Sequence, residues 1–491
     1  MPLAILLCVQ TCLLFRALDL LPVWSDEVFT LNTVAHPVHE IIPIVQHDIH
    51  PPLYFMLLRQ WAKLPLPWTR VAALRAFSAL WALLATLLLD LFWTSSLPDR
   101  LSRVLALSLF ALSPCFLLYS RMARSYSMQV ALVLLSVGLL QRWMKDPRSW
   151  LLACGASAAV LALLYTHYVP GVAVIAGFVL IGWRTLGAAR VAAFSLAAAA
   201  GYFPWAISLV DAAHRWGEAG SFSSSYTLTG SPVLEQFLKL GFGLVSLTIG
   251  ESFWAVSLFL APAILLLAVL GARTPEFSRR LAALLAIAAC VGYLGVARWV
   301  SYPFIPARLL WLLPFLSLAA ALGISHLPWP PIRTAVAGAV LLSYLSSDIL
   351  YLRRENFLNP GYTAPLPEIA VTLNAKAHPD DLILVDGYNT DFQALQLYLT
   401  GPAPVIVLDQ RTASTARGRV LTARAVWIVR NTRDVSPGHS TTGAQSAACA
   451  GRSRRDTLLD PYAPWQRFAL KIAGIQPAPE YFYQLTVCGP G

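Results

Sequence analysis

The sequence predicts a polytopic α-helical membrane protein that ends in a small α/β domain. Of its 491 residues, 57% are hydrophobic and only 12% are charged, and the mean hydropathy is +0.61. Soluble domains are typically about 45–50% apolar and about 25% charged, so this composition excludes an ordinary soluble protein. Long apolar runs fill the chain to about residue 350, and shorter runs separated by Pro, Gly and charged residues follow.

The long apolar runs predict about eleven membrane-spanning helices, because a helix needs about 20 predominantly apolar residues to cross the hydrocarbon core. The first run contains Arg16 and Asp19 and lacks a small-residue cleavage site, which indicates a retained helix rather than a signal peptide. The runs lie at 3–23, 71–93, 104–119, 126–141, 150–166, 169–183, 191–210, 253–271, 281–297, 309–326 and 334–350.

The basic residues predict the orientation of these helices. If the N-terminus is cytoplasmic, the loops richest in Lys and Arg are cytoplasmic too, as the positive-inside rule requires. The opposite loops, together with the C-terminal domain, are then extracytoplasmic. The net charge of +11 is thus mostly topogenic, and no basic block with interleaved aromatics indicates nucleic-acid binding. The basic residues are Arg100, Arg103, Arg142, Lys145, Arg148, Arg184, Arg190, Arg273, Arg279, Arg280 and Arg333, and the opposite loops are 24–70, 120–125, 166–168, 211–252 and 298–308.

Residues 351–491 are expected to form the separate α/β domain, and residues 1–350 the membrane domain. Alternating strand and helix patterns indicate a small sheet. The stretch 432–457, rich in Ser, Thr, Gly and Arg, predicts a mobile loop. Cys449 and Cys488 could form a disulfide in an oxidising compartment or stay free. The expected elements are helices at 366–377 and 391–399 and strands at 382–385, 405–408, 425–429, 468–473 and 481–487.

An acid pair, Asp26 and Glu27, directly follows the first apolar run. A carboxylate at a membrane boundary must be stabilised by partners, which makes these residues functional candidates. One of them could accept a proton from an attacking hydroxyl or amine. The alternative is a pair of solvated loop acids.

Histidines crowd the same loop. His36 with His39 and His47 with His50 are spaced i, i+3, which places each pair on one helix face and could suit a metal. The alternative is that most of them are polar residues of an interfacial segment. His50 differs, because the two prolines that follow it fix the backbone and direct the chain toward the second long helix.

Arginines mark two further boundaries on the predicted extracytoplasmic side. Arg121 and Arg124 lie three residues apart and could form a fork for phosphate, because guanidinium groups bind phosphate oxygens bidentately. They could instead be snorkelling anchors. Arg308 opens a long apolar helix from the same side, and Arg298 could join this pocket or stabilise the end of the preceding helix.

Five segments in this order resemble bacterial members of glycosyltransferase family 39. These are relatives of the protein O-mannosyltransferases and of the lipid A aminoarabinose transferases, with the GT-C fold, and the likeness covers about residues 1–350. The segments are Trp24-Ser25-Asp26-Glu27, Asp48-Ile49-His50-Pro51-Pro52-Leu53-Tyr54, Arg121-Met122-Ala123-Arg124-Ser125-Tyr126-Ser127-Met128, Tyr165-Thr166-His167-Tyr168 and Pro306-Ala307-Arg308-Leu309-Leu310.

The resemblance implies a polyprenyl-phosphate sugar donor, an extracytoplasmic active site in the bacterial inner membrane, and inverting transfer to an acceptor protein, glycan or lipid. By this analogy Asp26 is the catalytic base and Glu27 supports it, while Asp48 and His50 shape the same catalytic cavity. The donor phosphate would be bound by Arg121, Arg124, Arg308 and Tyr126, and the pocket lined by Tyr54, His167 and Tyr168.

Absent motifs narrow the chemistry further. The sequence has no Walker-type phosphate loop, no GxGxxG after a strand and no Asp-x-Asp pair for a nucleotide sugar. Oligosaccharyltransferase-type relatives carry an acidic metal ligand in the second external loop, but residues 120–128 contain no acid. We therefore predict no essential cofactor, with a divalent metal as the alternative. The alternative functions are a transporter or flippase of lipid-linked sugars and a scaffolding subunit, neither of which needs the acid pair.

Overall fold

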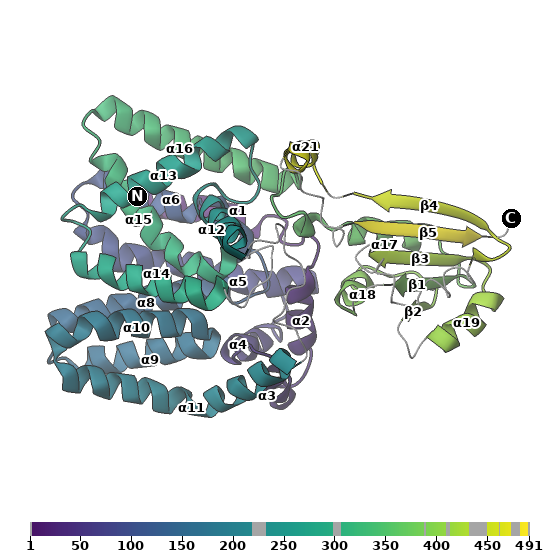
Figure 1. The fold of residues 1–491 in the computed structure, drawn as a ribbon, viewed down its shortest axis with the longest axis horizontal. Helices are drawn as coiled ribbons and strands as arrows, with labels where there is room; N and C mark the ends of the chain where they lie inside the picture. The colour runs from purple at the N-terminus through teal and green to yellow at the C-terminus, as the bar shows by residue number, and fades with distance from the viewer. Residues whose placement is uncertain are drawn as a thin grey trace. The chain divides into compact units, whose positions relative to one another are not determined.

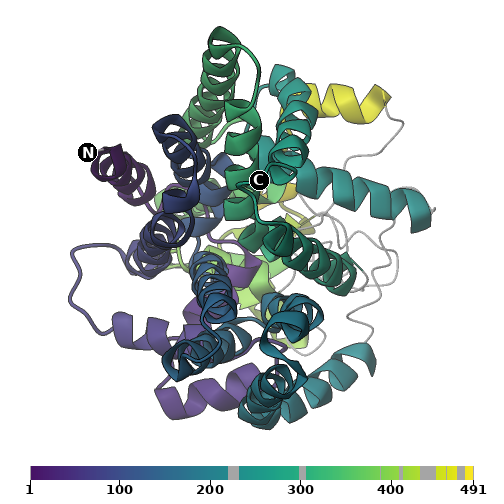
Figure 2. The same cartoon turned by 90° about the vertical axis from the view of Figure 1, so that its left-hand side faces the viewer.

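The computed structural model describes residues 2–218, 232–297, 306–386, 389–408, 413–431, 449–460, 462–472 and 482–489. The chain divides into two compact units, and the first combines Met1–Asp19 with Thr30–Asn356. The second combines Leu20–Phe29 with Phe357–Gly491. The first unit is a bundle of helices, whereas the second is built around a sheet (Figures 1 and 2).

Helices account for nearly all regular structure in the first unit. Helix α2 (Ser25–Thr33) begins in the second unit and continues into the first. The other elements are α1 (Pro2–Phe15), α3 (Val38–Gln46), α4 (Leu53–Trp61), α5 (Arg70–Trp93), η1 (Thr94–Ser96), α6 (Arg100–Ala111), α7 (Pro114–Ser120), α8 (Tyr126–Lys145), α9 (Trp150–Thr166), α10 (Tyr168–Leu186), α11 (Ala188–Glu218), α12 (Pro232–Ile249), η2 (Ala255–Phe259), α13 (Leu260–Ala272), α14 (Arg279–Ala297), η3 (Pro306–Leu312), α15 (Leu313–Ser325) and α16 (Pro330–Arg353).

The protein is a multi-pass membrane protein. Within the described residues, seven helical segments are long and apolar enough to cross a bilayer: α5, α8, α10, most of α11, η2 with α13, η3 with α15, and α16. The pair α6 and α7, bent by 44°, would be an eighth. Three further apolar helices, in α1, α9 and α12, are shorter. The fold class is as predicted, while the count of about eleven spans stays a prediction.

Two predicted spans are interrupted. The run 3–23 is helical only to Phe15, and Ala17 then adopts a positive φ of 48° that a continuing helix cannot contain. The run 104–119 breaks after Ala111, because Pro114 lacks an N–H and Ser113 caps a new helix by accepting from the Phe116 N–H. The stretches 24–70 and 211–252, predicted as loops, contain helices α2, α3, α4 and α12.

Glycines allow α13 and α15 to pack with their backbones in contact. A Cβ atom at Gly271 would collide with the Ala319 carbonyl oxygen, and one at Gly323 would collide with the Leu267 carbonyl oxygen. Small residues at helix crossings are a common way to bring membrane helices together. This crossing fixes α15, which continues directly from η3.

The second unit contains a five-stranded sheet with the strand order β2-β1-β3-β5-β4. Strands β2, β1 and β3 are parallel, whereas β5 pairs antiparallel with β3 and with β4. Leu384 lies opposite Ile428, and both belong to the buried core. The elements are η4 (Pro360–Thr363), α17 (Leu366–Lys376), β1 (Leu382–Asp386), α18 (Asn389–Gln396), β2 (Val405–Val407), α19 (Ala413–Thr422), β3 (Val426–Asn431), β4 (Ser453–Leu459), α21 (Pro464–Ile472) and β5 (Tyr483–Gly489).

Two predictions for this unit are wrong. The expected strand at 468–473 falls largely in helix α21. Phe468, Leu470 and Ile472 alternate as in a strand, but with Trp465 included the apolar residues also recur at helical spacing, so the pattern fits both structures. Strand β4 lies partly in the stretch 432–457 that was expected to be a loop; residues 432–448 are outside the described residues. Six of its seven residues are exposed, so β4 carries none of the buried alternation that marks a strand in a sequence.

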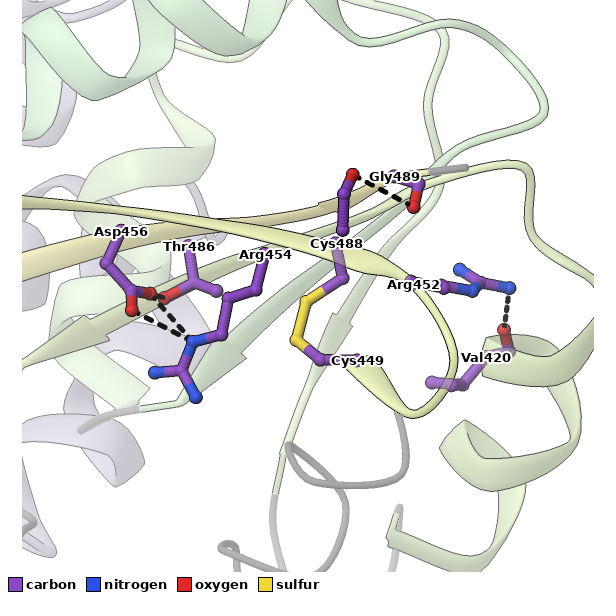
Figure 3. The surroundings of a disulfide bond; sticks show 9 residues. Val420, Cys449, Arg452, Arg454, Asp456, Thr486, Cys488 and Gly489 are labelled. Carbon is purple, nitrogen blue, oxygen red and sulfur yellow. Dashed lines mark hydrogen bonds and ion pairs between the residues drawn. A yellow bond between two sulfur atoms is a disulfide. The ribbon is translucent and has the colours of Figure 1, made fainter. Parts of the chain in front are cut away.

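A disulfide joins Cys449 to Cys488 of β5, with their Cα atoms 5.1 Å apart (Figure 3). This separation is typical of disulfides. Cys488 is fully buried in the core behind the sheet. The pairing that the sequence left open is therefore present, and it ties the segment before β4 to β5.

Candidate active site

Four chain segments of the first unit bring polar side chains together, and each residue lies at or near a helix start. His50 lies in the loop just before α4, and Arg124 lies in the turn just before α8. His167 is the N-cap of α10, and Arg308 lies in η3. The sequence predicted all four of these residues, although they are up to 258 positions apart (308 − 50).

His50 and Arg124 are in direct contact. The Arg124 Nη2 atom lies 2.8 Å from His50 Nε2, and because a guanidinium only donates, the imidazole Nε2 must accept. The neutral imidazole then carries its proton on Nδ1, which lies 3.2 Å from Asp48 Oδ1. Arg124 Nη1 also donates to the Thr30 hydroxyl at 3.1 Å. The result is a chain of contacts from Asp48 through His50 and Arg124 to Thr30.

Asp48 is a stabilised carboxylate. Burial alone would raise its pKa, but its contact with His50, the Ile49 N–H at 2.6 Å and the charge of Arg124 outweigh burial, and the pKa lies below the ordinary value. Asp48 is therefore ionised at neutral pH. Its negative charge holds the His50 proton on Nδ1 and leaves Nε2 for Arg124.

His167 experiences the charges of this group. Burial, followed by the electrostatic influence of the neighbouring His50, Arg308 and Arg124, lowers the pKa of His167 well below its ordinary value, so the ring is neutral. Its Nδ1 atom accepts from the Val169 N–H at 3.3 Å and caps α10.

Tyr168 lies in the same field. Its ring stacks on His167 with the centroids 5.2 Å apart, and its hydroxyl experiences the charges of Arg308 and Asp48. Of the predicted pocket residues, His167 thus experiences the charges of Arg124 and Arg308, and Tyr168 that of Arg308.

The electrostatics of the group favour an anion. Arg124 and Arg308 oppose one carboxylate, Asp48. Helices α4, α8 and α10 begin just after His50, Arg124 and His167 respectively. A helix N-terminus carries a partial positive charge and unpaired N–H groups, which together bind phosphate readily. The charges and helix starts around Arg124 and Arg308 therefore favour binding of an anion such as a phosphate group.

Arg121 does not join this group. It is only 2% exposed, and its guanidinium donates to the carbonyls of Arg16 at 2.7 Å and Ala17 at 2.5 Å and to the Tyr351 hydroxyl at 2.9 Å. These carbonyls follow the end of α1, where backbone oxygens lack helical partners. The predicted convergence of three arginines is therefore reduced to Arg124 and Arg308, and Arg121 holds the end of α1.

Tyr54 and Tyr126 support Arg124 from neighbouring positions. The Tyr54 hydroxyl is 2.8 Å from the Ser78 hydroxyl, which in turn donates to the Arg124 carbonyl at 2.9 Å. The Arg124 guanidinium lies 6.0 Å from the centroid of the Tyr126 ring. Both tyrosines are at most 5% exposed, and Tyr54 positions the Arg124 backbone through the Ser78 hydroxyl. Its place in the pocket stays a prediction.

The acid pair lies in the first turn of α2. Asp26 is half-buried and Glu27 is fully buried. Asp26 precedes Thr30, the partner of Arg124, by four residues, so the two side chains share one face of the helix. The segment packs within the second unit, where the Val23 N–H donates to the Tyr398 hydroxyl at 2.7 Å.

Sequence reasoning missed two polar residues, Thr30 and Glu251. Glu251 lies between α12 and η2, is 1% exposed, and accepts from the hydroxyls of Tyr119 and of Ser246, the latter at 2.9 Å. Burial raises its pKa to about 7, although both hydrogen bonds lower it. The Tyr119 ring meets Tyr126 edge-on at 5.5 Å. In the sequence, Glu251 could have been found as a single acidic residue between two apolar runs.

Metal ligands do not cluster in the described parts of the chain: no group of three or more His, Cys, Asp and Glu side chains is placed to hold an ion. Asp48 and His50 make a pair, but Arg124 holds the His50 Nε2 atom. His47 Nδ1 lies 2.8 Å from the Pro43 carbonyl oxygen. Arg298 lies outside the described residues. Independence from metal stays a prediction.

The chain has the GT-C fold of membrane glycosyltransferases. It is similar to ArnT from Cupriavidus metallidurans in the apo state, with a TM-score of 0.58 and 12% identity over 98% of this chain and 97% of that one. ArnT bound to undecaprenyl phosphate gives a TM-score of 0.55 at the same identity and coverage. The apo oligosaccharyltransferase of Archaeoglobus fulgidus gives 0.51 and 14% identity over 94% and 73%. No family model and no curated protein matches the sequence.

Proposed function

We propose that this protein is a membrane glycosyltransferase that moves a sugar from a polyprenyl-phosphate donor to an acceptor with inversion. The observation that carries the proposal is the anion site formed by Arg124 and Arg308 beside His50 and His167, at the starts of α4, α8 and α10. The binding of undecaprenyl phosphate by ArnT, a protein of the same fold, supports a lipid phosphate as the anion.

In the proposed reaction Arg124 and Arg308 bind the donor phosphate. The acceptor O–H or N–H gives its proton to the Asp26 carboxylate, and the acceptor atom bonds to the anomeric carbon as the bond from that carbon to the phosphate oxygen breaks. The electron pair leaves on the lipid phosphate, where preorganised cations stabilise the developing charge most effectively. Asp48 and His50 keep Arg124 oriented, and Glu27 supports Asp26.

We place the reaction on the extracytoplasmic face of the bacterial inner membrane. The distribution of basic residues supports this side, and so does the disulfide between Cys449 and Cys488, because such bonds persist in oxidising compartments. A reporter that folds only outside the cytoplasm, fused after Gly491, is expected to be active. Activity of a cytoplasm-only reporter at that position would refute this topology.

Donor binding tests the proposal directly. The full-length protein in nanodiscs is expected to bind radiolabelled undecaprenyl phosphate, and Arg308→Ala is expected to weaken binding at least tenfold. Arg280→Ala, a change at an exposed arginine on α14, is the matched control. Equal binding by both variants would remove Arg308 from the site. Transport of the lipid-linked sugar with no transfer would favour the flippase alternative.

The sugar and the role of the C-terminal unit belong to the same proposal. The transferred group is a hexose or a pentose, and we propose that residues 351–491 set acceptor choice or stability and perform no chemistry. No essential metal is proposed, and turnover is expected to survive an excess of EDTA. Loss of turnover with EDTA and its recovery with Mn²⁺ or Zn²⁺ would establish a metal requirement instead.

A further inference from the structure

Helix α21 belongs to the second unit (Figure 1). It has one buried side and one exposed apolar side. On the buried side, Gln466 is 7% exposed, and its amide donates to the carbonyl oxygens of Phe357 and, at 3.4 Å, Leu358. These contacts tie the helix to the start of the C-terminal chain. These hydrogen bonds fix the rotation of α21 about its own axis, and therefore which of its side chains face away from the unit.

The opposite side exposes two large apolar side chains. Phe468 is 66% exposed and Ile472 is 71% exposed. They are four residues apart, and with Trp465 and Ala469 they form a continuous apolar stripe at helical spacing. An exposed apolar stripe of this kind marks a surface that contacts a membrane or another protein.

Basic side chains border this stripe. Arg467 and Lys471 are also four residues apart and lie on the adjacent face of α21, and both are exposed. Arg467 makes an ion pair with Asp460, whereas Lys471 is in the last turn of the helix. An apolar stripe flanked by basic residues is the pattern of a helix that lies in the interface of an anionic membrane.

The chain connection limits how far the Phe357 contact of α21 is from the end of α16. Phe357, whose carbonyl holds Gln466, follows Arg353 by four residues, and Arg353 is the last residue of the candidate span α16. Four residues of chain reach at most about 14 Å. An interfacial helix buries its apolar face about 5–10 Å into the boundary between headgroups and acyl chains, so the surface of the bilayer is within reach.

We propose that α21 is an in-plane membrane anchor of the C-terminal unit. Phe468 and Ile472 insert among the lipid chains, and Arg467 and Lys471 contact anionic phosphate headgroups. This contact is independent of the proposed sugar transfer. It limits how far the unit that carries the acid pair moves from the leaflet.

Photo-crosslinking tests the anchor. p-Benzoylphenylalanine is placed at position 468 of the full-length protein in vesicles of phosphatidylcholine and phosphatidylglycerol, and the expected product of irradiation is a phospholipid adduct found by mass spectrometry. Leu421, 74% exposed on α19 of the same unit, is the matched control and is expected to give none. Adducts to protein only at position 468, or equal lipid adducts at both positions, would overturn the proposal.

A charge variant tests the headgroup contact. Lys471→Glu is expected to lower the lipid adduct yield at position 468 by about fivefold or more, because one basic residue near an anionic surface contributes about this factor. The same variant in pure phosphatidylcholine is expected to lose much less. An unchanged yield in the anionic vesicles would overturn the headgroup contact.

Discussion

Arg124 determines the tautomer of His50. Because the guanidinium can only donate, it selects the imidazole tautomer with the proton on Nδ1, and the nearby Asp48 carboxylate favours the same tautomer. The Nε2 atom of His50 is therefore occupied and is a poor candidate for the general base. This geometry leaves Asp26 as the stronger candidate for proton removal.

Arg124→Lys tests whether the planar guanidinium of Arg124 is needed for phosphate binding. Lysine keeps the positive charge but cannot contact His50 and Thr30 at the same time as a phosphate, because it lacks the planar set of donors. We expect undecaprenyl phosphate affinity to fall at least tenfold, as measured with radiolabelled lipid in nanodiscs. Arg280→Lys is the control. Full affinity in Arg124→Lys would mean that charge alone suffices at this position.

Asp26→Asn tests the base. The amide keeps the size of the side chain but cannot accept the proton, so we expect turnover to fall by about 10²–10⁴-fold, with unchanged lipid affinity. Glu27→Gln is expected to reduce turnover less and to lower thermal stability, because Glu27 is fully buried. Single-turnover transfer from a purified donor measures both effects. Near wild-type turnover in Asp26→Asn would exclude this residue as the base.

Glu251 makes stability depend on pH. Its pKa in the folded protein is about 7, above the ordinary value of 4.5, so folding favours the protonated form. This contribution is complete below about pH 4.5 and is lost as pH rises through 7, and a shift of this size corresponds to roughly 3 kcal/mol.

We therefore expect the melting temperature of the wild type to fall between pH 5 and pH 8 relative to that of Glu251→Gln. The half-exposed Glu40 provides the control Glu40→Gln, which should keep the wild-type slope. Parallel pH profiles for the wild type and Glu251→Gln would contradict the raised pKa.

At the scale of elements, the hydrophobic pattern predicted those strands whose residues are nearly all buried. Strands β1 and β3 are short apolar runs buried in the sheet, and both were predicted. Strand β4 is exposed along six of its seven residues, so its pairing with β5 comes from tertiary structure and leaves no mark in the pattern. Helix α21 is too short for its period to be read with confidence against a strand.

The site residues divide in a similar way. The starts of α4, α8 and α10 carry prolines and polar residues that are visible in the sequence, and the ordered segments placed His50, Arg124 and His167 together with Arg308. The role of Arg121 was not predictable, because its partners are backbone carbonyls that exist only where α1 stops early. Thr30 has no motif, and it is recognised only through its contact with Arg124.

Gly323→Ala tests the crossing of α13 and α15. The added methyl group would meet the Leu267 carbonyl oxygen, and overpacking of this kind typically costs about 1–3 kcal/mol. We expect a lower melting temperature and, through η3, weaker lipid binding at Arg308. Gly338→Ala on α16 has open space and should be neutral or slightly stabilising. A neutral Gly323→Ala would show that the crossing can open without cost.

At the scale of the whole molecule, the chain crosses between the two units more than once. Residues 20–29 belong to the C-terminal unit, although they lie between α1 and the rest of the membrane unit in sequence. The Trp24 ring meets Tyr362 edge-on at 5.9 Å, and the buried Val23 backbone donates to Tyr398. The acid pair is therefore held by the C-terminal unit, while Arg124 and Arg308 are held by the helical bundle.

Tyr398→Phe tests whether the acid pair depends on the C-terminal unit while phosphate binding depends on the helical bundle. The change removes the acceptor of the Val23 N–H, and Val23 is only 1% exposed, so an unsatisfied donor of this kind costs about 1–3 kcal/mol and loosens the segment that carries Asp26. We expect kcat to fall several-fold while the affinity for undecaprenyl phosphate stays unchanged, because the arginines that bind phosphate lie in the other unit. Tyr462→Phe, in the same unit, is the control and should leave kcat unchanged. Equal losses of kcat and lipid affinity in Tyr398→Phe would instead mean that the C-terminal unit also shapes the phosphate site.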